Sequence, residues 1–214
     1  MQFPDFKNEL KRLAEGFACA AGCDEVGRAP LAGPVVAAAC ILDPASIGRY
    51  RSKNKWYARV RDSKTTSAEE REILAQKILK HTLAWGVGEV WQAEIDKINI
   101  HHASLEAMRR AVENMRENFS SEKIFLFVDG KFKIPKLNMT QENIIDGDAK
   151  VLSISAASII AKVHRDGIMK KLHQKFPNYG FATHKGYPTR AHKAAIAKWG
   201  IQTVHRKSFI KSLS

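Results

Sequence analysis

The chain has 214 residues and a formal net charge of +13, and its 44% hydrophobic and 27% charged residues are typical of a globular protein. No apolar run approaches the ~18 residues needed to span a bilayer, and the N-terminus lacks a signal-peptide pattern, which argues against a membrane or secreted protein. Three cysteines without CxxC spacing, Cys19, Cys23 and Cys40, predict buried, reduced thiols in a cytoplasmic protein.

The first part of the chain predicts two buried strands joined by a tight connection. Residues 18–26 ("ACAAGCDEV") and 34–42 ("PVVAAACIL") are apolar runs of strand length, and the turn-rich "GRAPLAG" separates them. The next segment, 49–67, is polar and basic and predicts a loop. We therefore expect a buried pair of strands followed by an exposed excursion.

A helix start follows this loop. Ser67 can cap a helix over 68–81, because Glu70, three residues later, can close a capping box. "TLAWGVGEV" at 82–90 predicts a third strand, and residues 103–118 predict a second helix. Strands and helices therefore share this half of the chain.

The second half predicts a buried strand and then a long helix. "KIFLFVDG" at 123–130 is a strongly apolar strand that ends in Asp129 and Gly130. In residues 146–176 the apolar side chains recur at helical spacing beside a serine-rich face: Val151, Ile154, Ala157, Ile160, Ala161, Ile168 and Leu172. Together these elements predict an α/β fold, a sheet layered with helices, followed by a basic helical C-terminal portion.

Positive charge is concentrated in the last third of the sequence. Residues 149–214 hold 13 Lys and Arg against one acid, Asp166, whereas residues 1–148 hold 22 basic and 21 acidic residues. Such a segment is either a solvated helix face or a binding surface for a polyanion such as nucleic acid. Six aromatic residues interleaved with the charges favour nucleic acid, whose sugars and bases pack on rings: Phe176, Tyr179, Phe181, Tyr187, Trp199 and Phe209.

Carboxylates stand at the ends of the predicted strands. Asp24 and Glu25 end one apolar strand, Asp129 ends another, and Asp148 precedes the long helix. A single Asp at a strand end is most often a turn former, but an adjacent pair on an apolar strand lacks that explanation. Adjacent buried anions repel each other and lose hydration, so a cation between them is expected. Four converging carboxylates would suit hard divalent ions such as Mg²⁺ or Mn²⁺.

Other catalytic schemes find less support in the sequence. His101 and His102 are adjacent, and neighbours on a helix point in different directions, so a solvated face is expected rather than chelation. Spacing does not exclude cysteine–histidine or serine–histidine catalysis, although no segment specifically favours either one.

Several separated blocks resemble the type 2 ribonucleases H, specifically the bacterial ribonuclease HII family. These blocks are "DEVGRAPLAGPVVAAA" at 24–39, "RDSK" at 61–64, "FVDG" at 127–130, "GDAKVLSISAASIIAKVHRD" at 147–166, "FPNYGFATHKGYPTRAH" at 176–192 and "HRKSF" at 205–209. In order and spacing they cover nearly the whole chain. The resemblance implies an RNase H-like mixed central sheet flanked by helices, with a helical C-terminal region.

The resemblance also implies a reaction. It makes Asp24, Glu25, Asp129 and Asp148 the metal-coordinating acids and implies a divalent metal cofactor, Mn²⁺ or Mg²⁺, with two ions present when substrate is bound. It implies hydrolysis of the RNA strand of RNA–DNA hybrids and nicking 5′ of single ribonucleotides in duplex DNA, leaving a 3′-hydroxyl and a 5′-phosphate. The implied cellular roles are ribonucleotide removal from DNA and removal of RNA primers.

The resemblance further implies a set of substrate-binding residues. Gly27, Arg28 and Ala29 occupy the segment by which the family reads the 2′-hydroxyl at an RNA–DNA junction. Tyr187 matches the tyrosine that packs on the adjacent deoxyribose. Two more residues fall in blocks that the family places near the substrate backbone: Lys64 and Ser158.

One departure from the family pattern lies in this segment. The family usually has glycine where this chain has Ala29, and glycine permits both close backbone approach and positive φ. Alanine tolerates close approach only if its methyl points away, and it disfavours positive φ. We therefore expect the change to affect junction recognition without touching the metal ligands.

The resemblance covers one catalytic domain over 1–214, with a core at about 15–175 and a basic helical portion at about 176–214. A monomer that binds RNA–DNA hybrids and ribonucleotide-containing duplex DNA is expected. One alternative is a basic protein that binds nucleic acid without cleaving it, but carboxylates oppose phosphate binding unless a metal neutralises them. Another is the sister family, ribonuclease HIII, whose extra N-terminal domain would not fit into the residues before Asp24.

Overall fold

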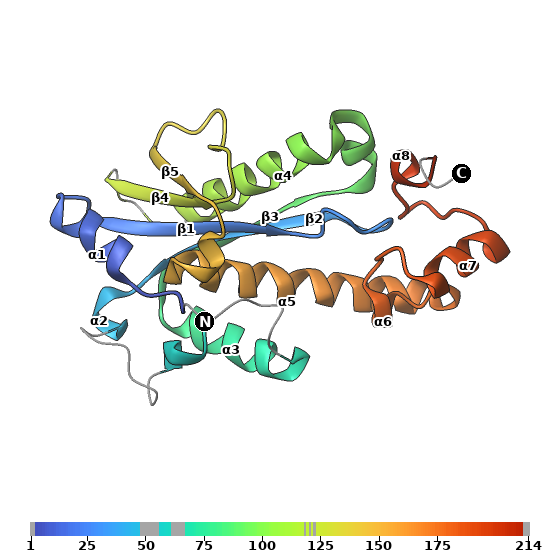
Figure 1. Ribbon diagram of the computed structural model, residues 1–214, viewed down its shortest axis with the longest axis horizontal. Coiled ribbons are helices and arrows are strands. Elements are labelled where there is room, and N and C mark those ends of the chain that lie inside the picture. The colour runs from blue at the N-terminus through green and yellow to red at the C-terminus, as the bar shows by residue number, and fades with distance from the viewer. Residues whose placement is uncertain are drawn as a thin grey trace.

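A mixed sheet of five strands forms the centre of the protein, with helices on both of its faces (Figure 1). The computed structural model describes residues 3–47, 56–60, 67–117, 119, 121 and 123–211. The strands are β1 (Cys19–Val26), β2 (Val35–Leu42), β3 (Thr82–Val90), β4 (Ile124–Asp129) and β5 (Thr140–Ile144). Their order across the sheet is β3-β2-β1-β4-β5. The predicted α/β class with a mixed central sheet is confirmed.

The sheet combines two kinds of strand pairing. β1, β2 and β3 form an antiparallel meander, whereas β4 runs parallel to β1 and β5 runs parallel to β4. The predicted strands at 18–26, 34–42, 82–90 and 123–130 correspond to the first four. β5 was not predicted, because its sequence, "TQENI", is polar and only half-buried at the sheet edge.

One helix layer covers each face of the sheet. α4 (Gln92–Glu117) packs on one face against β2 and β3, and α5 (Leu152–Lys175) packs on the other with α3 (Ala68–Lys80). The helices approach the strands closely where a strand carries glycine. A Cβ on Gly22 would lie 2.2 Å from the backbone nitrogen of Ile154, and one on Gly88 would lie 2.1 Å from the Ala107 carbonyl oxygen. Larger residues there would push α5 and α4 off the sheet.

The helix start predicted after the basic loop is confirmed. The Ser67 hydroxyl accepts a hydrogen bond from the Glu70 backbone N–H at 3.2 Å, and the Glu70 carboxylate accepts one from the Ser67 N–H at 3.2 Å. This capping box begins α3. Of the predicted loop at 49–67, residues 49–55 and 61–66 lie outside the described residues, and Trp56–Arg59 forms the 3₁₀ helix η1.

The predicted start of the second helix, at residue 103, is wrong. α4 begins at Gln92 and contains a kink at Asn99, where φ is +63°. The Asn99 side-chain oxygen accepts hydrogen bonds from the backbone N–H groups of His101 and His102, as a cap for the second part of the helix. The prediction therefore found only the part of α4 that follows this internal cap.

Short helices complete the fold at both ends of the chain. They are α1 (Lys7–Ala14), α2 (Pro44–Ile47), η3 (Gly147–Ala149), η4 (Pro177–Tyr179), α6 (Phe181–His184), α7 (Arg190–Trp199) and α8 (Lys207–Ile210). α1 was not predicted; its Glu9 is fully buried and accepts a hydrogen bond from the Ser153 N–H at 2.8 Å, near the start of α5. The predicted helical C-terminal portion is confirmed.

The three cysteines lie in two strands of the antiparallel meander. Cys19 and Cys23 are in β1 and Cys40 is in β2, and all are buried and free, as predicted. Among the residues that the structure describes, no helix is both long and apolar enough to cross a membrane.

Candidate active site

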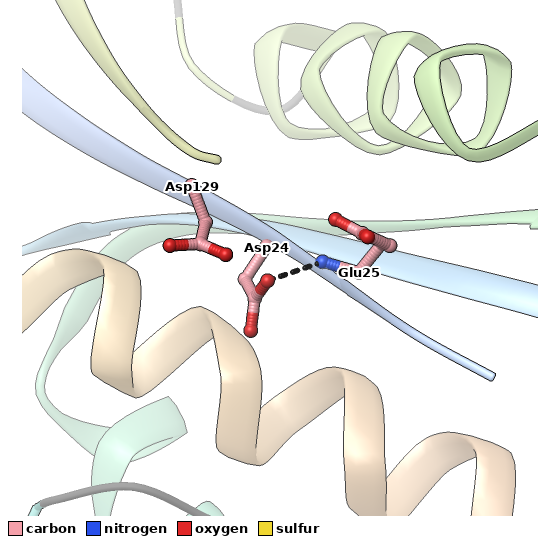
Figure 2. A group of neighbouring side chains, drawn as sticks. All are labelled: Asp24, Glu25 and Asp129. Atoms are coloured by element: carbon pink, nitrogen blue, oxygen red, sulfur yellow. Dashed lines mark hydrogen bonds between the residues drawn. The ribbon is translucent and has the colours of Figure 1, made fainter. Parts of the chain in front are cut away.

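Two acidic side chains meet where the parallel strands β1 and β4 end. The last paired residues are Cys23 and Val128, so Asp24 and Asp129 follow them side by side. Both strands are apolar up to this point, and burial of the apolar run fixes the position of the acids. Figure 2 shows the carboxylates of Asp24 and Asp129 pointing toward α5, whereas Glu25, the next residue on β1, points away from it.

Glu25 nevertheless belongs to the same cluster. One carboxylate oxygen from each of Asp24, Glu25 and Asp129 lies within 4.8 Å of the other two. The Glu25 backbone N–H donates to Asp24 Oδ1 at 2.7 Å (Figure 2), and the Gly147 N–H donates to Asp129 Oδ1 at 2.7 Å. Arg28 donates from Nη1 to Glu25 Oε1 at 3.3 Å. These contacts hold three carboxylates within reach of one bound cation.

The electrostatics of the cluster call for a positive partner. Burial raises the pKa of Asp24 well above its usual range, and the charges of Glu25 and Asp129 raise it further. Burial also raises the pKa of Glu25 and of Asp129, although Arg28 opposes the shift at Glu25 and the Gly147 N–H opposes it at Asp129. Three negative charges at this spacing are unfavourable alone, and a divalent cation with oxygen ligands removes the repulsion.

The fourth predicted acid lies next to this cluster. Asp148 is in η3, the turn between β5 and α5, and is not one of the three acids within 4.8 Å. Its charge raises the pKa of Asp24, and its backbone N–H donates to Asp129. Ser158, on α5, is buried and hydrogen-bonds to Asp24, which lowers the pKa of that carboxyl. Both predicted residues are therefore neighbours of Asp24.

The turn after β1 carries three of the predicted substrate-binding residues. Gly27 is buried with a φ of +93°, which favours glycine, whereas Arg28 and Ala29 are exposed. Four non-glycine residues of the described part have positive φ, and Ala29 is not one of them. Of the two effects expected of alanine at this position, the strain of a positive φ is therefore absent. The other expected effect, a methyl group that crowds close backbone approach, stays a prediction.

Two buried arginines, which the sequence pattern did not reveal, fix this turn. Arg206 donates to the carbonyl oxygens of Gly27 and Arg28 at 2.7 and 2.8 Å. Arg165, on α5, donates to the Pro34 carbonyl at 3.0 Å. Both arginines are fully buried, and burial lowers the pKa of Arg206 to about 9. The sequence signal was weak, because an arginine in a basic segment is normally assigned to the surface.

Tyr187 follows a loop that is joined to the same turn. The Gly186 carbonyl accepts a hydrogen bond from the Leu31 N–H at 2.8 Å, and Arg165 donates to the Lys185 carbonyl at 3.1 Å. A Cβ on Gly186 would lie 2.6 Å from a carbonyl oxygen of the turn, so this approach requires glycine. Tyr187 is 37% exposed. The structure thus brings the two predicted junction-reading segments side by side.

Not all of the aromatic residues interleaved with the basic segment are available to a ligand. Tyr179 and Phe181 are buried in a small core beneath α7, so their assignment to the binding surface is wrong. Trp199 and Tyr187 are exposed. The predicted site residue Lys64 lies outside the described residues.

The adjacent histidines form no metal site in the described part of the chain. Asp24, Glu25 and Asp129 are the only group there of three or more potential ligands. His101 instead lines a pocket of about 90 Å³ beside Glu25 and Asp129. His102 is exposed, with its backbone N–H bonded to Asn99.

Comparisons with known proteins agree with this geometry. The family model for ribonuclease HII matches residues 21–212. Ribonuclease HII of Polynucleobacter asymbioticus is 46% identical over 188 residues, which cover 88% of this chain and 91% of that protein. Ribonuclease HII of Vibrio cholerae serotype O1 is 47% identical over 197 residues, which cover 92% of this chain and 89% of that protein.

Solved structures share the fold. Ribonuclease H2 from Pyrococcus horikoshii superposes with a TM-score of 0.72 at 26% identity, covering 91% of this chain and 96% of that one. Bst-RNase HIII, determined in complex with Mn²⁺, superposes with a TM-score of 0.70 at 19% identity, covering 95% of this chain and 71% of that one. The sheet and its helices are therefore RNase H-like, and from the family model and the sequence relatives the chain belongs to the ribonuclease HII family.

Proposed function

We propose that this ribonuclease H hydrolyses the RNA strand of RNA–DNA hybrids and also nicks duplex DNA on the 5′ side of a single embedded ribonucleotide. The observation that carries the proposal is the cluster of Asp24, Glu25 and Asp129, whose oxygens lie within 4.8 Å of one another. Membership of the ribonuclease HII family supports the substrate class. Cleavage would leave a 3′-hydroxyl and a 5′-phosphate, as needed to remove ribonucleotides and RNA primers from DNA.

The residues present fit a divalent metal cofactor. Asp24, Glu25, Asp129 and Asp148 would hold Mg²⁺ or Mn²⁺, with two ions in place when substrate is bound. The donors are all carboxylate oxygens, which hard cations prefer, and the buried Asp24 carboxylate needs a counter-charge. Bound divalent ions supply Lewis-acid chemistry that activates water and stabilises the leaving oxygen.

Other residues would hold the substrate over this cluster. The backbone at Gly27, Arg28 and Ala29 would read the 2′-hydroxyl, and the Tyr187 ring would pack on the neighbouring deoxyribose. Arg28 is exposed and contacts Glu25, and it would also donate to a phosphate oxygen of a bound strand. Ser158 would orient Asp24 through its hydrogen bond, and Lys64 would contact the substrate backbone.

The exposed basic surface supports binding of a polyanion. α7 presents Arg190, Lys193 and Lys198, and the Lys198 ammonium lies 4.8 Å from the ring centre of the exposed Trp199. In Figure 1, α6, α7 and α8 gather at the end of the molecule toward which the β1–β2 turn projects. Phosphate contacts of this kind hold a duplex without reading its sequence.

A basic protein that binds nucleic acid without cutting it is disfavoured by the same cluster. Three partly buried carboxylates repel a phosphate backbone unless a cation neutralises them. We further propose that residues 1–214 act as one catalytic unit and as a monomer.

The test is nicking of a duplex that contains one ribonucleotide, with Mn²⁺ or Mg²⁺ and then with EDTA. We expect cleavage with either ion and none with EDTA. Asp129→Asn should lower turnover by several orders of magnitude, because an amide is a poorer metal ligand. Its affinity for the duplex should stay within a few-fold, since the substitution also removes negative charge near the phosphates.

Asp146→Asn provides the matched control. Asp146 is an exposed acid near Asp129 with a φ of +53°, which asparagine accepts readily. Asp146→Asn removes one negative charge, as Asp129→Asn does, but it removes no proposed metal ligand, so turnover should stay near the wild-type level. If Asp129→Asn keeps more than about a tenth of wild-type turnover, where metal-site losses run to orders of magnitude, Asp129 is not a ligand.

A further inference from the structure

Two buried histidines form a hydrogen-bonded chain that ends at the backbone of Tyr187. His192, on α7, lies 2.9 Å through Nδ1 from the Tyr187 carbonyl oxygen. Its Nε2 lies 3.2 Å from the Nε2 of His205, and the Gln202 backbone N–H donates to His205 Nδ1 at 3.0 Å. Both rings are almost completely buried. No step of the proposed reaction uses them.

The partners at the two ends of this chain assign the protons. A carbonyl oxygen can only accept, so His192 carries its proton on Nδ1 and its Nε2 is an acceptor. The Gln202 N–H, which can only donate, lies 3.0 Å from His205 Nδ1, closer than the Gln202 carbonyl oxygen at 3.3 Å, so we assign the His205 proton to Nε2, which then donates to His192. In this assignment both rings are neutral, and the His205 Nε2–H donor faces the His192 Nε2 acceptor. A proton added to His192 would place two N–H groups face to face at 3.2 Å.

The segment that contains His205 also holds the turn at 27–29, the other loop that is predicted to read the junction. Arg206, the residue after His205, donates to the carbonyl oxygens of Gly27 and Arg28. Successive residues of one segment therefore reach both loops, Arg206 directly and His205 through His192. This shared segment therefore links the position of the turn at 27–29, proposed to read the 2′-hydroxyl, to the position of Tyr187.

The surroundings of the pair keep both rings neutral. Burial lowers the pKa of His205 to about 4 and also lowers the pKa of His192, and each ring opposes a charge on a neighbouring imidazole. His184 stacks on His192 with ring centres 4.5 Å apart. Among the other titratable or charged groups nearby, the Tyr179 ring packs against His205. The charges of His173 and Lys185 lower the pKa of His184. The guanidinium groups of Arg165 and Arg206 interact with each other in the same region.

We propose that His192 and His205 are positioning residues for substrate selection, which hold Tyr187 at a fixed place relative to the turn at 27–29 through hydrogen bonds between neutral imidazoles. The inference rests on the proposed contact of Tyr187 with deoxyribose. Loss of the chain lets the Tyr187 backbone move, so selection of a DNA sugar after the cut ribonucleotide weakens. Cleavage inside a continuous RNA–DNA hybrid needs that contact less.

The measurement is the ratio of kcat/KM for a duplex with one ribonucleotide to kcat/KM for an RNA–DNA hybrid. His192→Ala should lower this ratio by roughly tenfold, a change equivalent to about 1.4 kcal/mol. His192→Asn should restore most of the ratio, because its amide nitrogen can take the place of Nδ1 and donate to the Tyr187 carbonyl. Thermal unfolding of each variant shows whether it folds, and His205→Gln, whose amide can still donate to His192, provides a second test.

A double-mutant cycle with Tyr187→Ala separates the inference from the proposed function. If His192 acts through Tyr187, then His192→Ala should not change the ratio further in a Tyr187→Ala background. His81→Asn, which removes a histidine stacked on Trp56 at the C-terminal end of α3, should leave the ratio unchanged.

The pH dependence gives a readout that a purely structural role would not move. The ratio of affinities for the two substrates in EDTA should fall in the wild type as the pH is lowered below 6.5, because burial lowers the pKa of His192 and a proton added there sets an N–H against the His205 Nε2–H. His192→Asn carries no titrating ring at this link, so its affinity ratio should be flatter. Titration of the acidic cluster affects both substrates and largely cancels in the ratio.

The outcomes discriminate between the two claims. If Tyr187→Ala leaves the ratio unchanged, the proposed role of Tyr187 fails and this inference fails with it. If Tyr187→Ala lowers the ratio but His192→Ala lowers both activities equally, only this inference is overturned. Additive effects in the double mutant would likewise show that His192 acts independently of Tyr187.

Discussion

Replacement of Gly27 by alanine tests whether the buried Arg165 side chain packs rigidly against the turn after β1. Gly27 has a φ of +93°, and a Cβ built on it would lie 2.2 Å from Nε and 2.7 Å from Cδ of Arg165. Arg165 has little freedom to move away, because its buried guanidinium donates to three carbonyl oxygens, including those of Pro34 and Lys185. The methyl group must therefore displace a charged, hydrogen-bonded side chain or shift the turn.

The expected cost has two parts. Positive φ disfavours alanine by about 1–2 kcal/mol. Loss of one buried hydrogen bond from a charged donor adds about 1.5–3 kcal/mol. Together they lower the free energy of unfolding by about 2.5–5 kcal/mol, a large fraction of the stability of a typical domain.

Gly16→Ala is the matched control for this substitution. Gly16 has a φ of +94°, and a Cβ there would meet no atom within 4 Å. Its cost should be the backbone part alone, about 1–2 kcal/mol. Thermal or urea unfolding of both variants gives the difference. For a chain of this length each kcal/mol lowers Tm by about 2–4 °C, so Gly27→Ala should unfold roughly 3–12 °C below Gly16→Ala.

Equal unfolding temperatures for the two variants would refute the reasoning. The space beneath Gly27 would then not be filled by a rigid Arg165. Arg165→Met in the Gly27→Ala background gives a second check, because it removes the guanidinium that the methyl group meets. The penalty of the alanine should be smaller in that background than in the wild type.

Three further predictions follow from charge and from the turn. Burial raises the pKa of Glu9 to about 7, so the folded state binds the Glu9 proton more tightly than the unfolded state does. The resulting stabilisation is complete below about pH 4.5 and is lost as the pH rises through 7. Across that range the free energy of unfolding of Glu9→Gln, measured in urea, should rise by about 3 kcal/mol relative to that of the wild type. Affinity for duplex should fall by about one log unit per log unit of salt for each phosphate neutralised, and a flat salt response would remove the basic C-terminal portion from the binding surface. Ala29→Gly should raise kcat/KM on a single embedded ribonucleotide by roughly tenfold or less, with less change on a hybrid. Because Ala29 lacks positive φ, the substitution should not raise the unfolding temperature. An unchanged ratio of the two kcat/KM values would show that the methyl group does not touch the substrate.

Most of the sheet could be predicted because its three central strands, β1, β2 and β4, are buried on both faces. Continuous apolar runs such as those of β2 and β4 leave few alternatives at their length. β5 escaped prediction because a polar edge strand is stabilised by its pairing with β4 and carries no pattern of its own. The first part of α4 escaped for a similar reason, since the cap at Asn99 interrupts the helical period.

The amino-acid sequence by itself was enough to predict a cation site and the acids that would form it. Two acids adjacent on an apolar strand, and a third at the end of another, are enough to predict a cation site, because buried like charges need a counter-ion. Only the tertiary structure decided that Asp24 and Asp129 lie side by side, since this depends on the parallel register of two strands about 100 residues apart. Only the tertiary structure, likewise, made Arg165, Arg206, His192 and His205 buried supports for the two loops rather than surface charge, because burial and hydrogen-bond partners depend on contacts between distant segments.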